Sequence, residues 1–359
     1  MSKTMFALCL VALVGCSSTP DSGDDGGVDG GVDSLPPFTT GVSTLSGSAD
    51  DGYADGIRGK ARFHNPVNVA YGPDGVLYVA DFDNDKLRTV DVATGFTSTL
   101  INQPTFRRPF GLLFAPNGTL YVSTDNDMVG DHYPNSGAVW RIDFATKKAI
   151  LVANKLGRPR SMAWLHDGRI AIADYQFHVI ELLDPSTGAM SLLAGTWGQK
   201  GMVDARGPAA RFATPYGLVQ RADGKLVVAD FENNRIRVVG LDGAVATLGG
   251  SATAGFVDGA MTEAQFNHPQ GLVMDGSGDL YVTDLGNYRI RRIHGDTIET
   301  IAGSGEAGWA DNDDPLAAKL HGLEGLSVKP DGSYVYFADG TRGELTPHNY
   351  VRMVQLHDN

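Results

Sequence analysis

Cysteine and long hydrophobic runs are both scarce in this chain of 359 residues. Its two cysteines, Cys9 and Cys16, lie close to the N-terminus, so we expect no disulfide bond to stabilise the rest of the sequence. The apolar run at residues 5–15 is too short to cross a bilayer as a helix. These absences argue against a disulfide-rich scaffold and against a bundle of membrane helices.

Positive charge is also in short supply. The chain has 29 Lys and Arg residues against 42 Asp and Glu residues, which gives a net charge of −13. A field of this sign repels phosphate backbones and anionic lipid surfaces. We therefore expect no nucleic-acid partner, and no contact with a membrane other than through a covalent anchor.

Glycine and proline, by contrast, are abundant. The sequence contains 46 Gly and 17 Pro, a density that long helices tolerate poorly and that many short strands joined by tight turns require. Because 42% of the residues are hydrophobic, the chain can still bury a substantial core. The composition favours a soluble all-β protein.

The N-terminal segment is typical of a secreted bacterial protein. Lys3 precedes the apolar run, which ends in Leu13-Val14-Gly15-Cys16, and this layout is that of a secretory signal. The last four residues resemble the lipobox of bacterial lipoproteins, which implies lipidation of Cys16. In that family a Ser at the next position, here Ser17, implies outer-membrane sorting. The alternative is an ordinary signal peptide with a cysteine by chance.

A repeated unit occupies most of the remaining sequence. One copy begins at residue 215 and reads PYGLVQRADGKLVVADFENNRIRVV. It contains a short apolar strand, an Asp-Gly turn, a second strand ending in Asp and a third strand. Several copies add a fourth strand, and copies recur every 43 to 56 residues, which is the size of a propeller blade. The six copies begin at Pro66, Pro109, Pro159, Pro215, Pro269 and, in a weaker form, Leu323.

The strand count predicts how the ring closes. The sixth copy ends without a fourth strand, whereas residues 42–47 match the fourth strands at 245–250 and 298–303. We expect the N-terminal strand to complete the last blade and so to remove an exposed edge.

The unit resembles the NHL repeat, a family of six-bladed β-propellers with a signature close to F-x-x-P-x-G followed by LYVADxxNxRI. The copy with Phe212, Pro215, Gly217, Asp230 and Asn233 fits closely, and Asn68, Ser161 and Thr124 depart from the pattern in other copies. The resemblance implies an all-β six-bladed propeller of four-stranded antiparallel blades. We therefore interpret residues 1–15 as a lipoprotein signal peptide, 16–40 as a disordered Gly/Asp/Ser/Pro tether, and 41–359 as the propeller.

Insertions and irregular residues gather at one end of the predicted blades, where the first strands begin. The residue between the repeated Pro and Gly varies from copy to copy, as a binding site requires. We predict an exposed ligand-binding rim in which the third and sixth blades face each other across the ring. Its residues are Phe110, Arg160, Tyr216, Gln270 and Glu324. The alternative is a solvated rim without function.

Metal sites are a further hypothesis. His64, His268 and His321 precede first strands in three neighbouring blades and could bind zinc at the channel mouth. The run at residues 81–85, DFDND, partly resembles a calcium loop. The Asp that ends each second strand is more simply explained as a turn cap that accepts backbone N–H groups.

Two functions from different classes remain open. The first is a monomeric, lipid-anchored binding scaffold of the bacterial cell envelope, facing the periplasm or the cell surface, for a protein, peptide or carbohydrate ligand and without a cofactor. The second is a metal-dependent propeller hydrolase or lyase, similar to gluconolactonases or peptidyl-hydroxyglycine lyases. The sequence has no Gly-x-Ser-x-Gly elbow and no phosphate-binding glycine loop leading into a helix. This favours the scaffold without deciding whether the chain is an enzyme.

Overall fold

The computed structural model describes residues 38, 40–126, 133–341 and 348–356. The chain divides into two units, residues 1–36 and residues 37–359, and the account below concerns the second. The predicted signal peptide, Cys16 and nearly all of the predicted tether lie outside the described residues. Within the described ranges, no helix is both long and apolar enough to span a bilayer.

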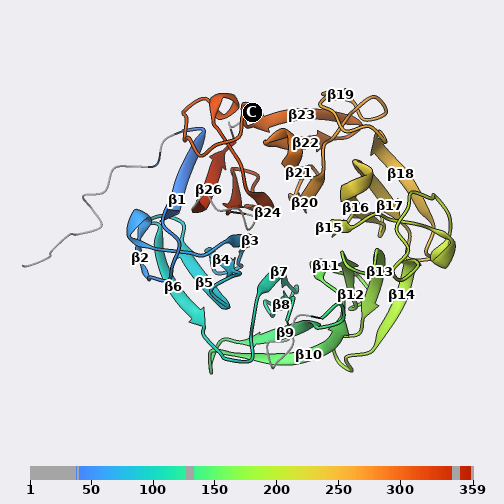
Figure 1. Cartoon of the computed structure of the whole chain (residues 1–359), viewed down its shortest axis with the longest axis horizontal. Coiled ribbons are helices and arrows are strands. Elements are labelled where there is room, and N and C mark those ends of the chain that lie inside the picture. The colour runs from blue at the N-terminus through green and yellow to red at the C-terminus, as the bar shows by residue number, and fades with distance from the viewer. Residues whose placement is uncertain (1–37, 39, 127–132, 342–347, 357–359) are drawn as a thin grey trace, which may run out of the picture. The chain divides into compact units, whose positions relative to one another are not determined.

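Six antiparallel sheets form a closed ring of six blades (Figure 1). Blade 1 contains β3 (Pro66–Tyr71), β4 (Val76–Asp81), β5 (Lys86–Asp91) and β6 (Phe96–Ile101), and blade 2 contains β7 (Pro109–Phe114), β8 (Leu120–Thr124), β9 (Gly137–Asp143) and β10 (Lys148–Leu156). Blade 3 contains β11 (Pro159–Trp164), β12 (Ile170–Asp174), β13 (Val179–Leu183) and β14 (Met190–Gly195), and blade 4 contains β15 (Pro215–Gln220), β16 (Leu226–Asp230), β17 (Arg235–Val239) and β18 (Val245–Gly250). Blade 5 contains β20 (Pro269–Met274), β21 (Leu280–Asp284), β22 (Arg289–His294) and β23 (Thr297–Ala302), and blade 6 contains β24 (Leu323–Val328), β25 (Tyr334–Asp339), β26 (Asn349–Gln355) and β1 (Val42–Ser48).

The N-terminal strand closes the ring, as the strand count predicted. β1 pairs with β26 in antiparallel register from Val42 opposite Val354 to Ser48 opposite Asn349, with one bulge. The last blade is therefore built from both ends of the propeller sequence, and its sheet order is β1-β26-β25-β24.

Local sequence explains the blades. The turn between first and second strands needs a residue with positive φ, and glycine supplies it at Gly75, Gly118 and Gly224, where φ is near 80°. The second strand lies inside the sheet, and all five residues of β16 are buried. Hydrophobic clusters join neighbouring blades, and the phenylalanine that precedes a first strand, such as Phe212, is fully buried.

Four glycine-rich segments, which we call covering segments, run along the outer strands of blades 1, 4, 5 and 6. They comprise residues 52–62, 201–211, 255–265 and 308–319, and in each the first N–H donates to the carbonyl that follows the segment. Two of them contribute the short strands β2 (Gly56–Ile57) and β19 (Gly259–Ala260), which pair with β6 and β23. The other two make single bridges, one to Ala244 and one to Val42.

A buried ion-pair network fastens each covering segment. In blade 1, Asp81 accepts a hydrogen bond of 2.8 Å from the N–H of His64, which confirms the predicted turn cap. It also accepts one of 2.7 Å from Arg88, which is fully buried. Arg88 continues outward to Asp55 and to the carbonyl of Ala54 in the covering segment. The equivalent trios are Asp230–Arg237–Asp204, Asp284–Arg291–Asp258 and Asp339–Arg352–Asp311.

Candidate functional site

The first strands of the six blades surround the central axis. Each of β3, β7, β11, β15, β20 and β24 contacts the first strand of the next blade, in a closed cycle. The repeated glycine allows this close approach. A Cβ atom on Gly217 would lie 2.5 Å from the carbonyl oxygen of Gln270, and one on Gly271 would lie 2.6 Å from that of Glu324. The variable residue, which lies between the repeated Pro and the repeated Gly, is therefore held at the same level along the channel axis in each blade.

The varying residues fill the channel instead of forming an open rim. We call the group Val67, Phe110, Arg160, Tyr216, Gln270 and Glu324 the plug. The first five are at most 8% exposed, and Glu324 is half-buried. The predicted exposure of these side chains is therefore wrong, because six closely spaced strands leave a channel narrow enough for their side chains to fill.

Contacts within the plug join neighbouring blades and also blades that are not neighbours in the ring. The guanidinium of Arg160 lies 4.1 Å from the ring centroid of Phe110, and the rings of Phe110 and Tyr216 meet edge to face at 5.6 Å. The hydroxyl of Tyr216 donates to a carboxylate oxygen of Glu324 at 3.4 Å. Arg160 of blade 3 and Glu324 of blade 6 line the same cavity, which is the arrangement expected of blades that face each other.

The sequence did not reveal the partner of Arg160. Its guanidinium forms a bidentate pair with Asp125, and one of the two hydrogen bonds is 3.1 Å long. Asp125 is 2% exposed and follows β8 in blade 2, where Thr124 replaces the repeated aspartate. The sequence feature that could have revealed this pair is the displacement of the repeated aspartate by one residue, from position 124 to position 125. This displacement moves the carboxylate from the turn cap into the channel.

Burial and charge fix the protonation of the plug. Burial acts to lower the pKa of Arg160, but the charge and hydrogen bonds of Asp125, together with the charge of Glu324, outweigh it, so the pKa is raised and the side chain stays cationic. The pKa of Tyr216 is raised well above its usual value, first by burial and then by Glu324. Tyr216 is therefore a neutral hydrogen-bond donor across the physiological pH range.

A recess of about 180 Å³ lies on the loop-rich side of the plug. We call it the mouth recess. Arg160, Tyr216, Gln270 and Glu324 contribute to it from the first strands, and Arg158 also lines it. The other lining residues directly follow second strands: Tyr175, Phe231 and Leu285. The recess thus combines aromatic walls with charged and amide groups.

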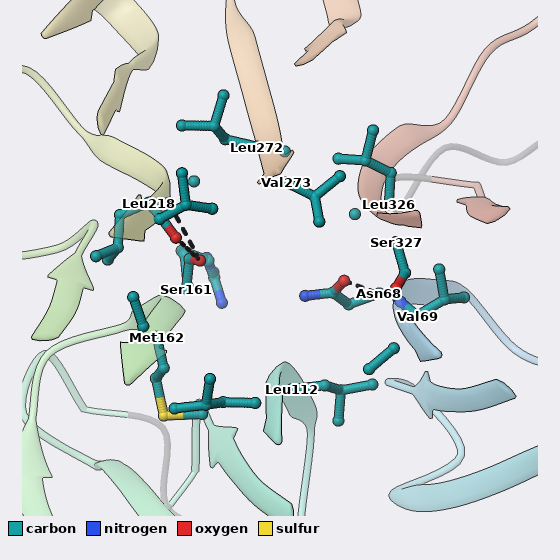
Figure 2. Close-up of a pocket in the computed structure, with 18 of the residues that line it drawn as sticks. Asn68, Val69, Leu112, Ser161, Met162, Leu218, Leu272, Val273, Leu326 and Ser327 are labelled. Atoms are coloured by element: carbon teal, nitrogen blue, oxygen red, sulfur yellow. Dashed lines mark hydrogen bonds between the residues drawn. The ribbon is translucent and has the colours of Figure 1, made fainter. Parts of the chain in front are cut away.

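A larger cavity of about 310 Å³ lies on the other side of the plug, toward the short turns between first and second strands (Figure 2). We call it the hairpin chamber. Its side chains include Leu112, Met162, Leu218, Leu272 and Leu326. The polar groups beside them are engaged locally: the hydroxyl of Ser161 accepts from the N–H of Leu218, and that of Ser327 accepts from Tyr71. The surface of this chamber therefore combines apolar side chains with hydrogen-bonded polar groups.

The three predicted zinc ligands have separate surroundings. His64 faces Asp51 at 3.8 Å, His268 packs on the ring of Phe231 at 4.7 Å, and His321 packs on Trp309 at 4.6 Å. Among residues 38, 40–126, 133–341 and 348–356, no three or more His, Cys, Asp or Glu side chains are grouped so as to hold a metal ion. The zinc site remains a hypothesis, and these ranges contain no ligand cluster that matches it.

The proposed calcium loop is occupied by the protein's own hydrogen bonds. Asp81 binds Arg88, Asp83 accepts from the side chain of Asn65, and Asp85 accepts from the N–H of Arg108. Parts of the insertions at this end of the blades, residues 127–132 and 342–347, lie outside the described residues.

Comparison with known proteins identifies the repeat. The family model of the NHL repeat matches residues 266–293, the segment that runs from the buried Phe266 through β20 and β21 into β22. The chain carries an NHL repeat, and its fold is a six-bladed β-propeller. In the NHL propeller, the Gly and Asp positions that recur from blade to blade thus have physical roles in strand contact and turn capping.

Curated relatives share part of their length with the NHL propeller. Protein SUPPRESSOR OF QUENCHING 1, chloroplastic, of Arabidopsis thaliana is 27% identical over 286 residues, which cover 70% of this chain and 27% of that protein. NHL repeat-containing protein 2 of Homo sapiens is 26% identical over 320 residues, which cover 83% of this chain and 41% of that protein. The chain therefore spans well under half the length of these relatives.

Solved structures resemble the NHL propeller in fold. An auxiliary nutrient binding protein from Bacteroides ovatus superposes with a TM-score of 0.67 at 18% identity, covering 89% of this chain and 78% of that one. A gluconolactonase from Xanthomonas campestris superposes with a TM-score of 0.59 at 15% identity, covering 90% and 96%. At these identities the likeness concerns the fold alone.

Proposed function

We propose that this NHL propeller is a binding scaffold that holds a small ligand, or one group of a larger ligand, in the mouth recess. One observation carries the proposal: the position that varies between blades brings four different side chains to a single recess on an otherwise regular frame. These residues are Arg160, Tyr216, Gln270 and Glu324. A rigid frame with variable residues at one end is the usual design for recognition.

The lining indicates the chemistry of the ligand. Tyr175, Tyr216 and Phe231 offer aromatic surfaces, and the rings of Tyr175 and Phe231 lie 5.7 and 5.8 Å from that of Tyr216. Glu324 supplies a carboxylate, and the amide oxygen of Gln270 has no hydrogen-bond partner within the described residues. This set suits a neutral or cationic ligand with a flat face and hydroxyl or amide donors, as in a carbohydrate or a peptide. The net charge of −13 disfavours a polyanion.

Calorimetric titration with neutral oligosaccharides and with uncharged or cationic peptides tests this proposal. For the ligand that binds, Gln270→Leu and Tyr216→Phe should each weaken binding by tenfold or more, because each removes a polar group from the recess. Val273→Ile is the matched control, since Val273 lies on the same strand β20 but lines the hairpin chamber. Binding by none of these compounds, or equal weakening by the control, would contradict the proposal.

Metal analysis of the purified protein separates the scaffold from the alternative enzyme. The scaffold predicts that chelation changes neither folding nor ligand binding. One zinc per chain, lost together with hydrolase or lyase activity when His64, His268 or His321 is replaced by Ala, would favour the metal-dependent alternative. The structural likeness to a gluconolactonase does not favour that alternative, because it extends to the fold alone.

We further propose that the protein is anchored to the bacterial envelope through a lipid on Cys16, with the propeller beyond a tether. The support is the sequence Leu13-Val14-Gly15-Cys16 and the absence of Lys and Arg from residues 17–37. Cys16→Ala should release the protein from the membrane fraction. Retention of this variant on membranes after a high-salt wash would show that the anchor is not this lipid.

A further inference from the structure

The outer edge of blade 3 departs from the pattern of four other blades. In blades 1, 4, 5 and 6, a buried arginine binds an aspartate of the covering segment, and a threonine of the outer strand binds the same aspartate. In blade 1 these residues are Arg88, Asp55 and Thr99. The outer strand, the third strand and the covering segment are thus held together by one polar network.

In the part of the chain that the structure describes, blades 2 and 3 have no covering segment, and blade 2 compensates with its own side chains. Trp140 occupies the register of the arginine, and its indole donates to Thr124 at 2.9 Å and packs against Phe106. Gln103 both accepts from and donates to the backbone of Ala149 on the outer strand. Blade 2 is therefore sealed by apolar packing and by one glutamine side chain.

Blade 3 instead places an acid where the other blades place the arginine. Glu181 pairs with Ile172 and Leu192, the register in which Arg88 pairs with Val79 and Thr99. The side chain is 6% exposed, and its Oε2 atom has no hydrogen-bond partner within the described residues. In four blades the buried arginine at this register is paired with an aspartate of the covering segment. In blade 3 the buried glutamate at the same register has no such ion pair within the described residues.

The groups that shift the pKa of Glu181 include no cationic side chain. The pKa of Glu181 is raised to about 7, first by burial and then by the charge of Asp174, while a hydrogen bond from the side chain of Trp197 acts to lower it. Asp174 itself accepts four backbone N–H groups, from residues 157, 158, 176 and 177. Trp197, immediately beyond β14, is 57% exposed.

The outer strand of blade 3, β14, also lacks a paired strand at this place, although the 3-10 turn Gly207–Ala209 packs against it. β14 is the last strand of its sheet, and within the described residues no strand or bridge pairs with its outer edge. In blades 1 and 5 the equivalent positions, Thr97 and Ile298, pair with the covering segments. The position in blade 3 is Met190, and its neighbour Ser191 is exposed. Open strand edges of this kind accept an additional strand.

We propose that the outer edge of blade 3, formed by β14 with Glu181 beneath it and Trp197 beside it, is a docking site for an extended segment of a partner protein that carries an arginine or lysine. The four covering segments show that a segment of this protein's own chain binds at this register. In them an aspartate meets an arginine, and in blade 3 the charges are reversed. The chain's own residues 17–37 contain no Lys or Arg and do not meet the requirement.

Binding of short synthetic peptides tests the proposal. The probe is a fluorescein-labelled seven-residue peptide that alternates Thr and Val around a central Arg, and its counterpart has Glu at the centre. Fluorescence anisotropy should show the Arg peptide binding at least tenfold more tightly. The same Arg peptide with alternate N-methylated amides should lose binding, because it cannot pair with β14.

A charge reversal in the protein provides the decisive comparison. Glu181→Arg restores the residue of the repeat and should reverse the preference, so that the Glu peptide binds more tightly. Glu181→Gln should remove the preference for the Arg peptide over the Glu peptide. If circular dichroism shows that Glu181→Arg does not fold, the result for Glu181→Gln tests the proposal on its own. Glu299→Gln, the same acid-to-amide change at an exposed position on the outer strand of blade 5, should leave peptide binding unchanged. Equal binding of the two peptides, no binding of either, or an unaltered preference in Glu181→Gln would overturn the proposal.

Discussion

At the scale of single residues, buried carboxylates decide how stability responds to pH. The pKa of Glu181 is near 4.5 in a solvated chain and about 7 in the fold. Because the folded-state value is the higher one, the stability linked to this proton is fully present below pH 4.5 and is lost as the pH rises through 7. The loss amounts to about 3 kcal/mol above pH 7.

Glu181→Gln should remove this dependence. We expect the variant to be more stable than the wild type by up to about 3 kcal/mol at pH 8.5, and the advantage to shrink toward pH 4.5. Urea unfolding at both pH values measures it. The difference between the two proteins cancels the titration of the other buried acids, such as Asp81 and Asp230, whose pKa burial raises to about 6. A pH-independent difference would mean that Glu181 is already ionised throughout this range.

The pair between Arg160 and Asp125 makes a second prediction at this scale. Asp125→Asn leaves a buried guanidinium without its counterion and should cost about 3–5 kcal/mol of unfolding free energy. Replacing both residues, as Arg160→Met with Asp125→Leu, should cost much less, because no unpaired charge remains. A thermodynamic cycle from urea unfolding gives the coupling. Additive effects of the two substitutions would show that the pair is not coupled.

At the scale of elements, the strand β1 is the piece on which ring closure depends. Removing residues 17–40 should leave the melting temperature nearly unchanged. Removing residues 17–47 takes away nearly all of β1, which exposes the edge of β26 and the hydrophobic contacts of Val42 and Leu45. Differential scanning calorimetry should therefore show a clearly lower transition for the longer deletion. Equal transitions would mean that the last blade is stable without its fourth strand.

Sequence patterns predicted strands and turns well where one backbone conformation requires a particular type of residue. The match of residues 42–47 to two fourth strands located β1, and the Gly of each Asp-Gly turn located the hairpins. The pattern could not show that Arg88, Arg237, Arg291 and Arg352 reach the covering segments, because their aspartates lie 33 or 41 residues earlier in the sequence. Such pairings become visible only when the strands are folded next to one another.

At the scale of the whole molecule, the ring determines where the predicted site residues lie. The sequence placed Arg160, Tyr216 and Glu324 around one axis, and the structure brings them to one recess. It could not give the width of the channel, so the residues expected on an exposed rim are buried in the plug. Likewise, three histidines in neighbouring blades do not share a position, because each belongs to a separate loop with its own aromatic or acidic neighbour.

The plug makes the two ends of the axis interdependent. Arg160, Tyr216 and Glu324 line both the mouth recess and the hairpin chamber, so they form a shared partition with one face toward each compartment. A molecule that shifts these side chains from one side alters the wall that the other side presents. Occupancy of the two compartments is then thermodynamically linked. If a ligand in one compartment changes the affinity of the other compartment by some factor, a ligand in the second changes the affinity of the first by the same factor.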